Sequence, residues 1–351
     1  MSPDEPLVLS IDAMGGDHAP DSVLGGLALI AKDGFNLRFL IHGDEAKIQP
    51  WLDQHPDVKA ITELRHTDKA IAMDAKPSQA VRSGKSSSMW NTLAAVKSGE
   101  AAVAVSAGNT GALMAMSKLV LRTVEGVHRP AIAASWPTPQ GHCVVLDVGA
   151  NVEADAEQLV EFAIMGEAYS RAIHDKAAPS VGLLNIGSEE LKGVEYVRQA
   201  ADLLKKDELG LNYIGFVEGN DISMGTSDVV VTDGYTGNIA LKTAEGTARL
   251  VSGFVKDALT SSLLAKLGAL LAMNGLKSLK TRMDPRTVNG GVFLGLNGIV
   301  LKSHGGTDAT GFASTLRLAR QVGRSHFGED VTKNLKRLRA LQEKSEGIPA
   351  Q

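Results

Sequence analysis

Cysteine is almost absent from this sequence of 351 residues, in which Cys143 is the only one. A single thiol cannot close a disulfide within the chain, which suits a reducing compartment. Because Cys143 begins the apolar run Val144–Leu146, we expect it to be structural. Aromatic residues make up only 4% of the chain and the net charge is −4. Neither value favours binding to nucleic acid.

Long apolar runs are also missing. The best candidate for a membrane span, Leu263–Met273, is short and contains Lys266. The first residues, MSPDEP, are too polar and acidic for a signal peptide. The sequence has neither the Gly-x-Ser-x-Gly elbow of serine hydrolases nor the His or Cys spacing of a metal site. We therefore expect a soluble, cytoplasmic protein with no metal, no cofactor and no covalent acyl-enzyme.

Glycine is abundant, with 37 residues, and it follows a series of short apolar runs. Each run is typical of a β-strand, and a helix-like segment follows each turn. This alternation predicts an α/β fold in three layers, with helices on both faces of a mostly parallel sheet. We see no linker and expect one catalytic domain over residues 1–351. The predicted strands are Leu7–Ile11, Leu37–Ile41, Ala101–Val105, Val144–Val148, Val181–Asn185, Asp228–Val231 and Ile299–Lys302.

One segment departs from this rhythm. Residues 259–283 are rich in leucine and basic, and we expect a protruding helical arm over residues 256–284. Asn274-Gly275 is a helix-breaking pair, which predicts two helices joined by a turn there. So much apolar area outside the sheet suits either a dimer contact or a membrane surface. The leucines with this predicted role are Leu263, Leu267, Leu270 and Leu271.

Ligands of parallel α/β sheets collect beyond the carboxyl ends of the strands, so the turns there are the candidate site. In the turn after the first strand, two glycines let the backbone approach a ligand, and the carboxylates either orient a group, bind a cation or only cap the turn. The turn that begins at Ser106 has the form of an anion cradle at a helix start, with an ordinary capped helix as the alternative. The candidate residues for phosphate or substrate in these two turns are Asp12, Gly15, Gly16, Ser106, Gly108, Asn109, Thr110 and Gly111.

A later strand ends in a turn of the same design, Asp233–Asn238. Thr236 and Gly237 are candidates for anion binding, and the amide of Asn238 is placed to donate to a developing oxyanion. Capping of the helix is again the alternative. Lys192 follows another strand end and can pair with phosphate, while His304 begins a further glycine turn.

A basic stretch lies between the first and the second of these turns. Its cations are either a solvated loop or a docking patch for an acidic partner. The candidate docking residues are Arg65, Lys69, Arg82 and Lys85.

These motifs, taken together, resemble the PlsX family, the phosphate acyltransferases of bacterial phospholipid synthesis. The resemblance extends from about residue 7 to about residue 330. Gly306 is a departure, because the family commonly has serine at this position of the turn. The motifs occur in the family's order: IDAMGGDHAP, SAGNTGA, RPAIA, LDVGAN, GLLNIGSEE, VVVTDGYTGN and LKSHGGTDATGF.

The resemblance implies a homodimer with a fold similar to phosphate acetyltransferases and with helices that protrude near the dimer interface. It implies transfer of a long-chain acyl group from acyl carrier protein to inorganic phosphate. It further implies that Lys192 and Asn238 act in catalysis. The product would pass to a membrane enzyme, which suits a protein at the inner face of the cell membrane.

Two other functions are compatible with the same turns. A CoA-dependent phosphate acetyl- or butyryltransferase shares the chemistry, and a non-catalytic anion-binding scaffold at the membrane shares the cradles. A dehydrogenase is disfavoured, because no dinucleotide fingerprint follows the first strand.

Overall fold

A computed structural model describes residues 5–206, 209–276, 290–325 and residue 331 of the chain. Eleven strands form one sheet in the order β3-β2-β1-β4-β11-β10-β5-β6-β9-β7-β8. The strands are β1 (Leu7–Asp12), β2 (Leu37–Gly43), β3 (Thr62–His66), β4 (Val103–Ser106), β5 (Ala131–Thr138), β6 (Gly141–Leu146), β7 (Ser180–Leu184), β8 (Asn212–Val217), β9 (Val229–Val231), β10 (Gly291–Leu294) and β11 (Ile299–Lys302).

The helices fill the connections between these strands. They are α1 (Asp21–Ala31), α2 (Glu45–Asp53), α3 (Pro56–Lys59), α4 (Pro77–Ser83), α5 (Ser88–Lys97), α6 (Thr110–Leu121), α7 (Ala156–His174), α8 (Glu195–Leu204), α9 (Gly219–Met224), α10 (Gly234–Thr260), α11 (Leu263–Leu271) and α13 (Ala309–Arg324). The α/β fold is confirmed, and so is each of the seven strands that the sequence predicted. Strands β3, β5, β8 and β10 were not predicted from the sequence.

The sheet consists of two parallel sets joined by antiparallel strands. The first parallel set is β3, β2, β1, β4 and β11, and the second is β6, β9, β7 and β8. Between them β10 and β5 pair antiparallel with each other and with β11 and β6. The strand direction therefore reverses along the ladder from the first set to the second.

Alternate side chains of the central strands enter two cores, one on each face of the sheet. Val229 and Val231 lie in a core with residues of α1, α13 and α7, whereas Val230 lies in a core with residues of α5 and α6. This alternation is expected for strands that are covered on both faces. The three layers follow from it.

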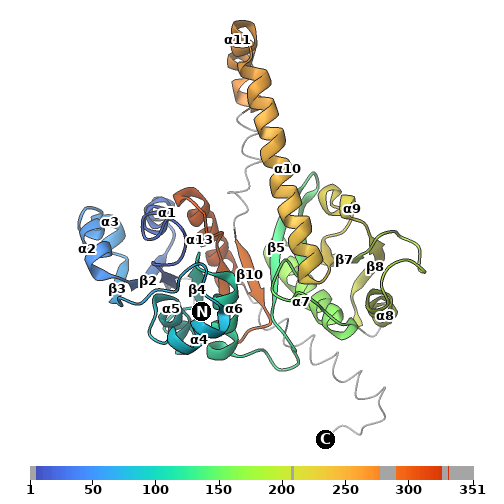
Figure 1. The fold of residues 1–351 in the computed structure, drawn as a ribbon, viewed down its shortest axis with the longest axis horizontal. Coiled ribbons are helices and arrows are strands. Elements are labelled where there is room, and N and C mark those ends of the chain that lie inside the picture. Colours follow the sequence, from blue (N-terminus) through green and yellow to red (C-terminus); the bar gives the residue numbers. More distant parts are fainter. Residues whose placement is uncertain (1–4, 207–208, 277–289, 326–330, 332–351) are drawn as a thin grey trace, which may run out of the picture.

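The sheet turns over between its two parallel sets. Helices α13 and α7 line the same core, yet Figure 1 shows α13 above the first set and α7 below the second. Right-handed twist, accumulated over several strands, explains this change. The exchange of the two sheet faces turns the strands of the second set around in space. Because the second set also runs in the opposite direction within the sheet, the two effects cancel. The carboxyl ends of both sets consequently point to the same side of the molecule.

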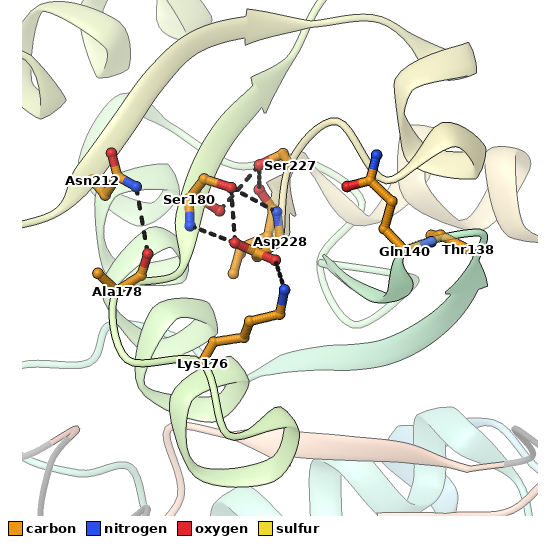
Figure 2. A network of polar contacts seen from close by, with 9 residues as sticks. Thr138, Gln140, Lys176, Ala178, Ser180, Asn212, Ser227 and Asp228 are labelled. Atoms are coloured by element: carbon orange, nitrogen blue, oxygen red, sulfur yellow. Dashed lines mark hydrogen bonds and ion pairs between the residues drawn. The ribbon is translucent and has the colours of Figure 1, made fainter.

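At the opposite ends of the second set, polar side chains hold the strands in register. Figure 2 shows Asp228, just before β9, accepting hydrogen bonds from the backbone N–H and the hydroxyl of Ser180 at 2.9 and 3.0 Å. Lys176 forms an ion pair of 3.0 Å with the same carboxylate. Ser227 donates to the carbonyl of Ser180 at 3.1 Å. This network aligns the amino-terminal ends of β7 and β9. The candidate site lies at the opposite, carboxyl ends of these strands.

Helix α10 continues far beyond the sheet, and α11 lies at its tip (Figure 1). Within α10 only Gly234 and Gly237 are buried, so most of its 27 residues stand clear of the core. The predicted protruding arm is thus a continuation of this helix. No helix in the described ranges is long and apolar enough to cross a membrane.

The position of the break in the arm was predicted wrongly. The helices separate at Ser261–Ser262, where the Ser262 hydroxyl caps α11 by accepting from the N–H of Ala265 at 3.1 Å. α11 ends at Leu271 with a turn at Ala272, and Asn274 and Gly275 lie in the helical segment that follows, so the predicted turn is present but comes two residues earlier. A serine N-cap starts a new helix more effectively than Asn-Gly ends one here. The rest of the predicted second helix, from residue 277, lies outside the described residues.

Candidate active site

A buried charge cluster closes the carboxyl end of the first parallel set. Asp12 ends β1, and its Oδ2 accepts a hydrogen bond of 2.6 Å from the hydroxyl of Ser106, which ends β4. Lys302 ends β11, and its Nζ donates to the carbonyls of Ala107, at 3.3 Å, and of Ser303. Burial raises the pKa of Asp12, and it lowers the pKa of Lys302 to about 8. We call Asp12, Ser106 and Lys302 the Asp12–Lys302 cluster.

The glycine turns that the sequence identified as a cradle pack tightly over this cluster. A β-carbon on Gly15 would lie 2.5 Å from Oδ2 of Asp12 and 2.7 Å from the backbone nitrogen of Gly108. The Gly108 N–H donates to the Ser106 hydroxyl at 3.0 Å. Gly16 has a φ of +111° and lies against the carbonyl of Gly305. The structure therefore brings these predicted residues together, with Ser106 and Gly108 engaged within the protein.

Asn109 also forms internal hydrogen bonds. Its side-chain oxygen caps α6 by accepting from the Ala112 N–H at 2.8 Å, and its amide donates to the carbonyls of Met73 and Ala75. This is the capping alternative that the sequence left open, with a further tether to residues 73–75. Thr110 and Gly111 follow it, exposed at the start of α6.

A second buried carboxylate, Asp147, organises the carboxyl end of the second parallel set. Its Oδ1 accepts from the backbone N–H groups of Ile132, Gly149 and Ala150 at 2.9–3.1 Å. Its Oδ2 accepts from the backbone and the side chain of Asn151 at 2.6 and 2.9 Å. Burial raises the pKa of Asp147, while these donors oppose the shift. The sequence analysis gave this residue no role.

Helix α10 begins directly on the loop that Asp147 holds. Asp233 is the N-cap of the helix and accepts from the N–H of Thr236 at 2.8 Å and from its hydroxyl at 3.0 Å, so Thr236 is a donor to the cap and not the cap itself. A β-carbon on Gly237 would lie 2.0 Å from the carbonyl oxygen of Asp147, which explains the glycine. The amide nitrogen of Asn238 lies 2.8 Å from the β-carbon position of Gly149. Asn238 therefore faces the loop after β6, and it is exposed.

Lys192 lies at the same end of the sheet, in the loop between β7 and α8. Its Nζ forms an ion pair of 2.7 Å with Glu189, which raises the pKa of the lysine. The side chain is half-exposed, and the carbonyl of Lys192 accepts from the Asn185 amide at 3.1 Å. Because β7 and β9 are adjacent and parallel, Lys192 and Asn238 share one edge of the sheet.

Helix α10 connects the two ends of the site electrostatically. Lys242, one turn after Asn238, lies close enough to lower the pKa of both Lys302 and His304, where burial is the larger cause. His304 accepts a hydrogen bond from the Gly306 N–H through Nδ1 at 3.2 Å. The first and second parallel sets thus contribute to one region, with α10 between them.

The sequence signal for Lys302 and Asp147 was present but weak. Each residue follows a run of buried apolar side chains at a strand end, and each lies in a motif already noted. Charged residues are mostly exposed in proteins, so the sequence alone favours a surface position for both. Their burial becomes evident only from the fold.

The remaining candidates are the four docking residues, the single cysteine and possible metal ligands. Arg65 pairs with Glu63 at 2.8 Å and with Glu100 at 2.6 Å, while Lys69, Arg82 and Lys85 are exposed. Cys143 is buried in β6, which raises the pKa of its thiol to about 12 and keeps it protonated at neutral pH. The described residues contain no group of three or more His, Cys, Asp or Glu side chains that could hold a metal ion.

Lys302→Met is expected to change how stability depends on pH. The pKa of this lysine falls from 10.5 in the unfolded chain to about 8 in the folded protein. Between these values the unfolded chain binds more protons, so the stability contributed by Lys302 rises with pH, by up to about 1.4 kcal/mol per unit. Urea unfolding of both proteins at about pH 7.5, 8.5 and 9.5 tests this. A difference in unfolding free energy that is constant over this range would contradict it.

Comparison with known proteins relates the chain to one family. The model of a family described as "Fatty acid synthesis protein" matches residues 7–329. Proteins named phosphate acyltransferase are 60% identical in Maricaulis maris, over 95% of this chain and 96% of theirs, and 59% identical in Caulobacter vibrioides, over 95% and 93%. A solved phosphotransacetylase from Streptococcus pyogenes has a TM-score of 0.59 at 16% identity, covering 91% of this chain and 94% of its own.

Proposed function

The chain belongs to the PlsX family of phosphate acyltransferases, and from this premise we propose how its residues carry out the reaction. It is an enzyme that transfers a long-chain acyl group from acyl carrier protein to inorganic phosphate, giving acyl phosphate for phospholipid synthesis. The identity of 60% over almost the whole chain carries this conclusion.

The reaction needs little covalent help from the protein. An oxygen of hydrogen phosphate attacks the thioester carbonyl carbon, a C–O bond forms, and the C–S bond breaks. The proton of hydrogen phosphate ends on the sulfur of the carrier's thiol. The enzyme must hold an anion and a thioester in line and stabilise the negative charge on the carbonyl oxygen. A buried thiol such as Cys143, protonated at neutral pH, has no part in this chemistry.

Asn238 is the donor that we assign to the carbonyl oxygen. Its exposed amide projects from the first turn of α10, where the helix dipole also favours negative charge. The loop that Asp147 holds supports its position. Lys192 supplies a cation on the same edge of the sheet, for the phosphate or for the departing thiolate. His304 and the Asp12–Lys302 cluster lie at the carboxyl end of the first parallel set, and Lys242 on α10 lies between them and Asn238.

Lys192→Ala tests the assignment of the cation. We expect the KM for phosphate to rise by about tenfold or more, because a hydrogen bond to a charged group is lost, and the KM for acyl carrier protein to change less. The measurement is phosphate-dependent release of the free carrier, with acyl phosphate trapped by hydroxylamine. Palmitoyl carrier protein and acetyl-CoA are offered in parallel, to separate this function from a CoA-dependent acetyltransferase. Normal kinetics for the variant would remove Lys192 from the site.

The carrier protein, the dimer and the membrane are parts of the same proposal. Lys69, Arg82 and Lys85 are exposed cations in one stretch and suit an acidic partner such as the carrier, whereas Arg65 is already paired. Leu263 and Leu271 on α11 are 86% and 84% exposed, which suits contact with a lipid surface or a second subunit. The cytoplasmic face of the membrane is where the labile product is consumed.

Changing Leu270 and Leu271 together to glutamate tests the arm. Because both side chains are exposed on α11, the variant is expected to fold and to lose binding to anionic vesicles, as measured by co-sedimentation. If it stays dimeric and active on soluble substrate, the membrane role stands. If the unaltered protein never binds such vesicles, the arm serves only the dimer.

A further inference from the structure

Large apolar side chains are exposed together at the carboxyl end of the second parallel set. Leu191 is 91% exposed and Ile186 is 79% exposed. Elsewhere in the described residues such side chains are scattered singly or lie on α10 and α11. An exposed apolar cluster away from the arm suggests a ligand or a partner. We call its six residues the apolar rim: Val152, Ile186, Leu191, Val194, Tyr235 and Ile239.

Hydrogen bonds hold the loops of the rim against one another. The Gly234 N–H donates to the carbonyl of Asn151 at 2.7 Å, which brings Val152 beside the start of α10. The hydroxyl of Tyr196 donates to Asp233 at 3.0 Å, which draws the start of α8 to the same helix terminus. The three loops therefore present one surface.

The loop between β7 and α8 is folded onto itself with its apolar side chains outward. The Asn185 amide donates to the carbonyl of Lys192 at 3.1 Å, and a β-carbon on Gly193 would lie 2.1 Å from the side-chain oxygen of Asn185. This arrangement leaves Ile186, Leu191 and Val194 no internal contact that would bury them.

Two rim residues are direct sequence neighbours of the residues assigned to the reaction. Leu191 immediately precedes Lys192, and Ile239 immediately follows Asn238. Phosphate gains nothing from apolar neighbours, so they serve another part of the substrate. The acyl chain is bonded to the carbonyl carbon under attack, and its first methylenes must therefore lie within a few bond lengths of it.

We propose that the apolar rim binds the acyl chain of the donor thioester, beginning at Ile239 and continuing over Leu191, Ile186 and Val194. This proposal rests on the function given above and specifies its substrate subsite. Binding the chain there removes apolar surface of both molecules from water, which favours long chains over short ones. The rim is the part of the active edge that selects the donor.

Leu191→Ser tests the proposal through the preference for chain length. The ratio of kcat/KM for palmitoyl carrier protein to that for butyryl carrier protein should fall about tenfold, because only the long chain extends across the rim. Ile186→Ser should lower the same ratio. The matched control is Leu119→Ser on α6, which is 51% exposed and outside the rim. Its ratio should equal that of the unaltered enzyme.

Each other outcome has a defined meaning. An unchanged ratio in both rim variants would overturn the acyl-chain subsite. A Leu191→Ser variant that sediments as a monomer when the unaltered protein is a dimer would assign the rim to a second copy of the chain. Loss of vesicle binding with an unchanged ratio would assign it to the lipid surface. An unaltered enzyme that makes acyl phosphate from neither donor would overturn the proposed function itself, and the subsite would fall with it.

Discussion

Asn238→Ala is expected to lower kcat by roughly 10²- to 10³-fold while the KM for phosphate changes little. The amide is assigned to the oxyanion, which exists only in the transition state, so its loss should leave ground-state binding almost intact. Steady-state kinetics with palmitoyl carrier protein and varied phosphate measure both parameters. Circular dichroism and the unfolding midpoint should match the unaltered enzyme, because the Asn238 side chain is exposed.

The matched control is Asn212→Ala. Asn212 is also an exposed asparagine, at the amino end of β8, where its amide donates to the carbonyl of Ala178 at 3.4 Å. Its removal should leave kcat within about twofold, since surface changes away from a site have small effects. A kcat for Asn238→Ala within threefold of the unaltered value would show that another group stabilises the oxyanion.

Asp147→Ala is expected to reduce the free energy of unfolding by about 3–5 kcal/mol. The carboxylate is fully buried and accepts five hydrogen bonds, four of them from backbone N–H groups. Removing it leaves those donors without their acceptor and takes support from the loop beneath Gly237 and Asn238. Urea denaturation measures the loss, and kcat should fall with it because Asn238 depends on that loop.

Two further variants make this result specific. Asp147→Asn keeps the shape and one acceptor, so it should cost less than the alanine variant. Asp53→Ala removes an exposed carboxylate that pairs with Lys59 at 2.8 Å, and it should change stability by no more than about 0.5 kcal/mol. If Asp147→Ala is as stable as Asp53→Ala, water satisfies the donors and the carboxylate is not a structural centre.

Much of the fold follows from local sequence. An apolar run followed by glycine predicted seven strands, because burial on both faces leaves no polar alternation to obscure the run. Strand β5 was missed, since its half-buried outer part contains Trp136 and Pro137 and reads as a loop. Strand β8 was missed because it begins at exposed Asn212 and contains Gly215 at a positive φ. Pairing with other strands gives both segments their conformation: β5 pairs with β6 and β10, and β8 pairs with β7.

The candidate site was predicted less completely. Their place at strand ends, together with the family resemblance, selected Asn238 and Lys192 as candidates, and their catalytic roles stay predictions. The same reasoning assigned Ser106 and Asn109 to a ligand, whereas the structure gives both of them hydrogen-bond partners within the protein. The roles of Lys302 and Asp147 become evident only when their burial is known. The apolar rim needed knowledge of exposure, which no pattern of hydrophobic residues in a sequence provides.

The order of the strands in the sheet has a consequence for folding during synthesis on the ribosome. Strand β11 lies beside β4, although almost 200 residues separate them, and α13 packs on α1, with Arg317 paired to Asp33 at 2.8 Å. The amino-terminal strands are therefore synthesised early, but the parallel set to which they belong is complete only after β11 has been synthesised. Until β11 and α13 emerge, the edge of β4 and the apolar face of α1 have no cover. Contacts so distant in sequence close slowly, so these apolar surfaces stay exposed for longer during synthesis.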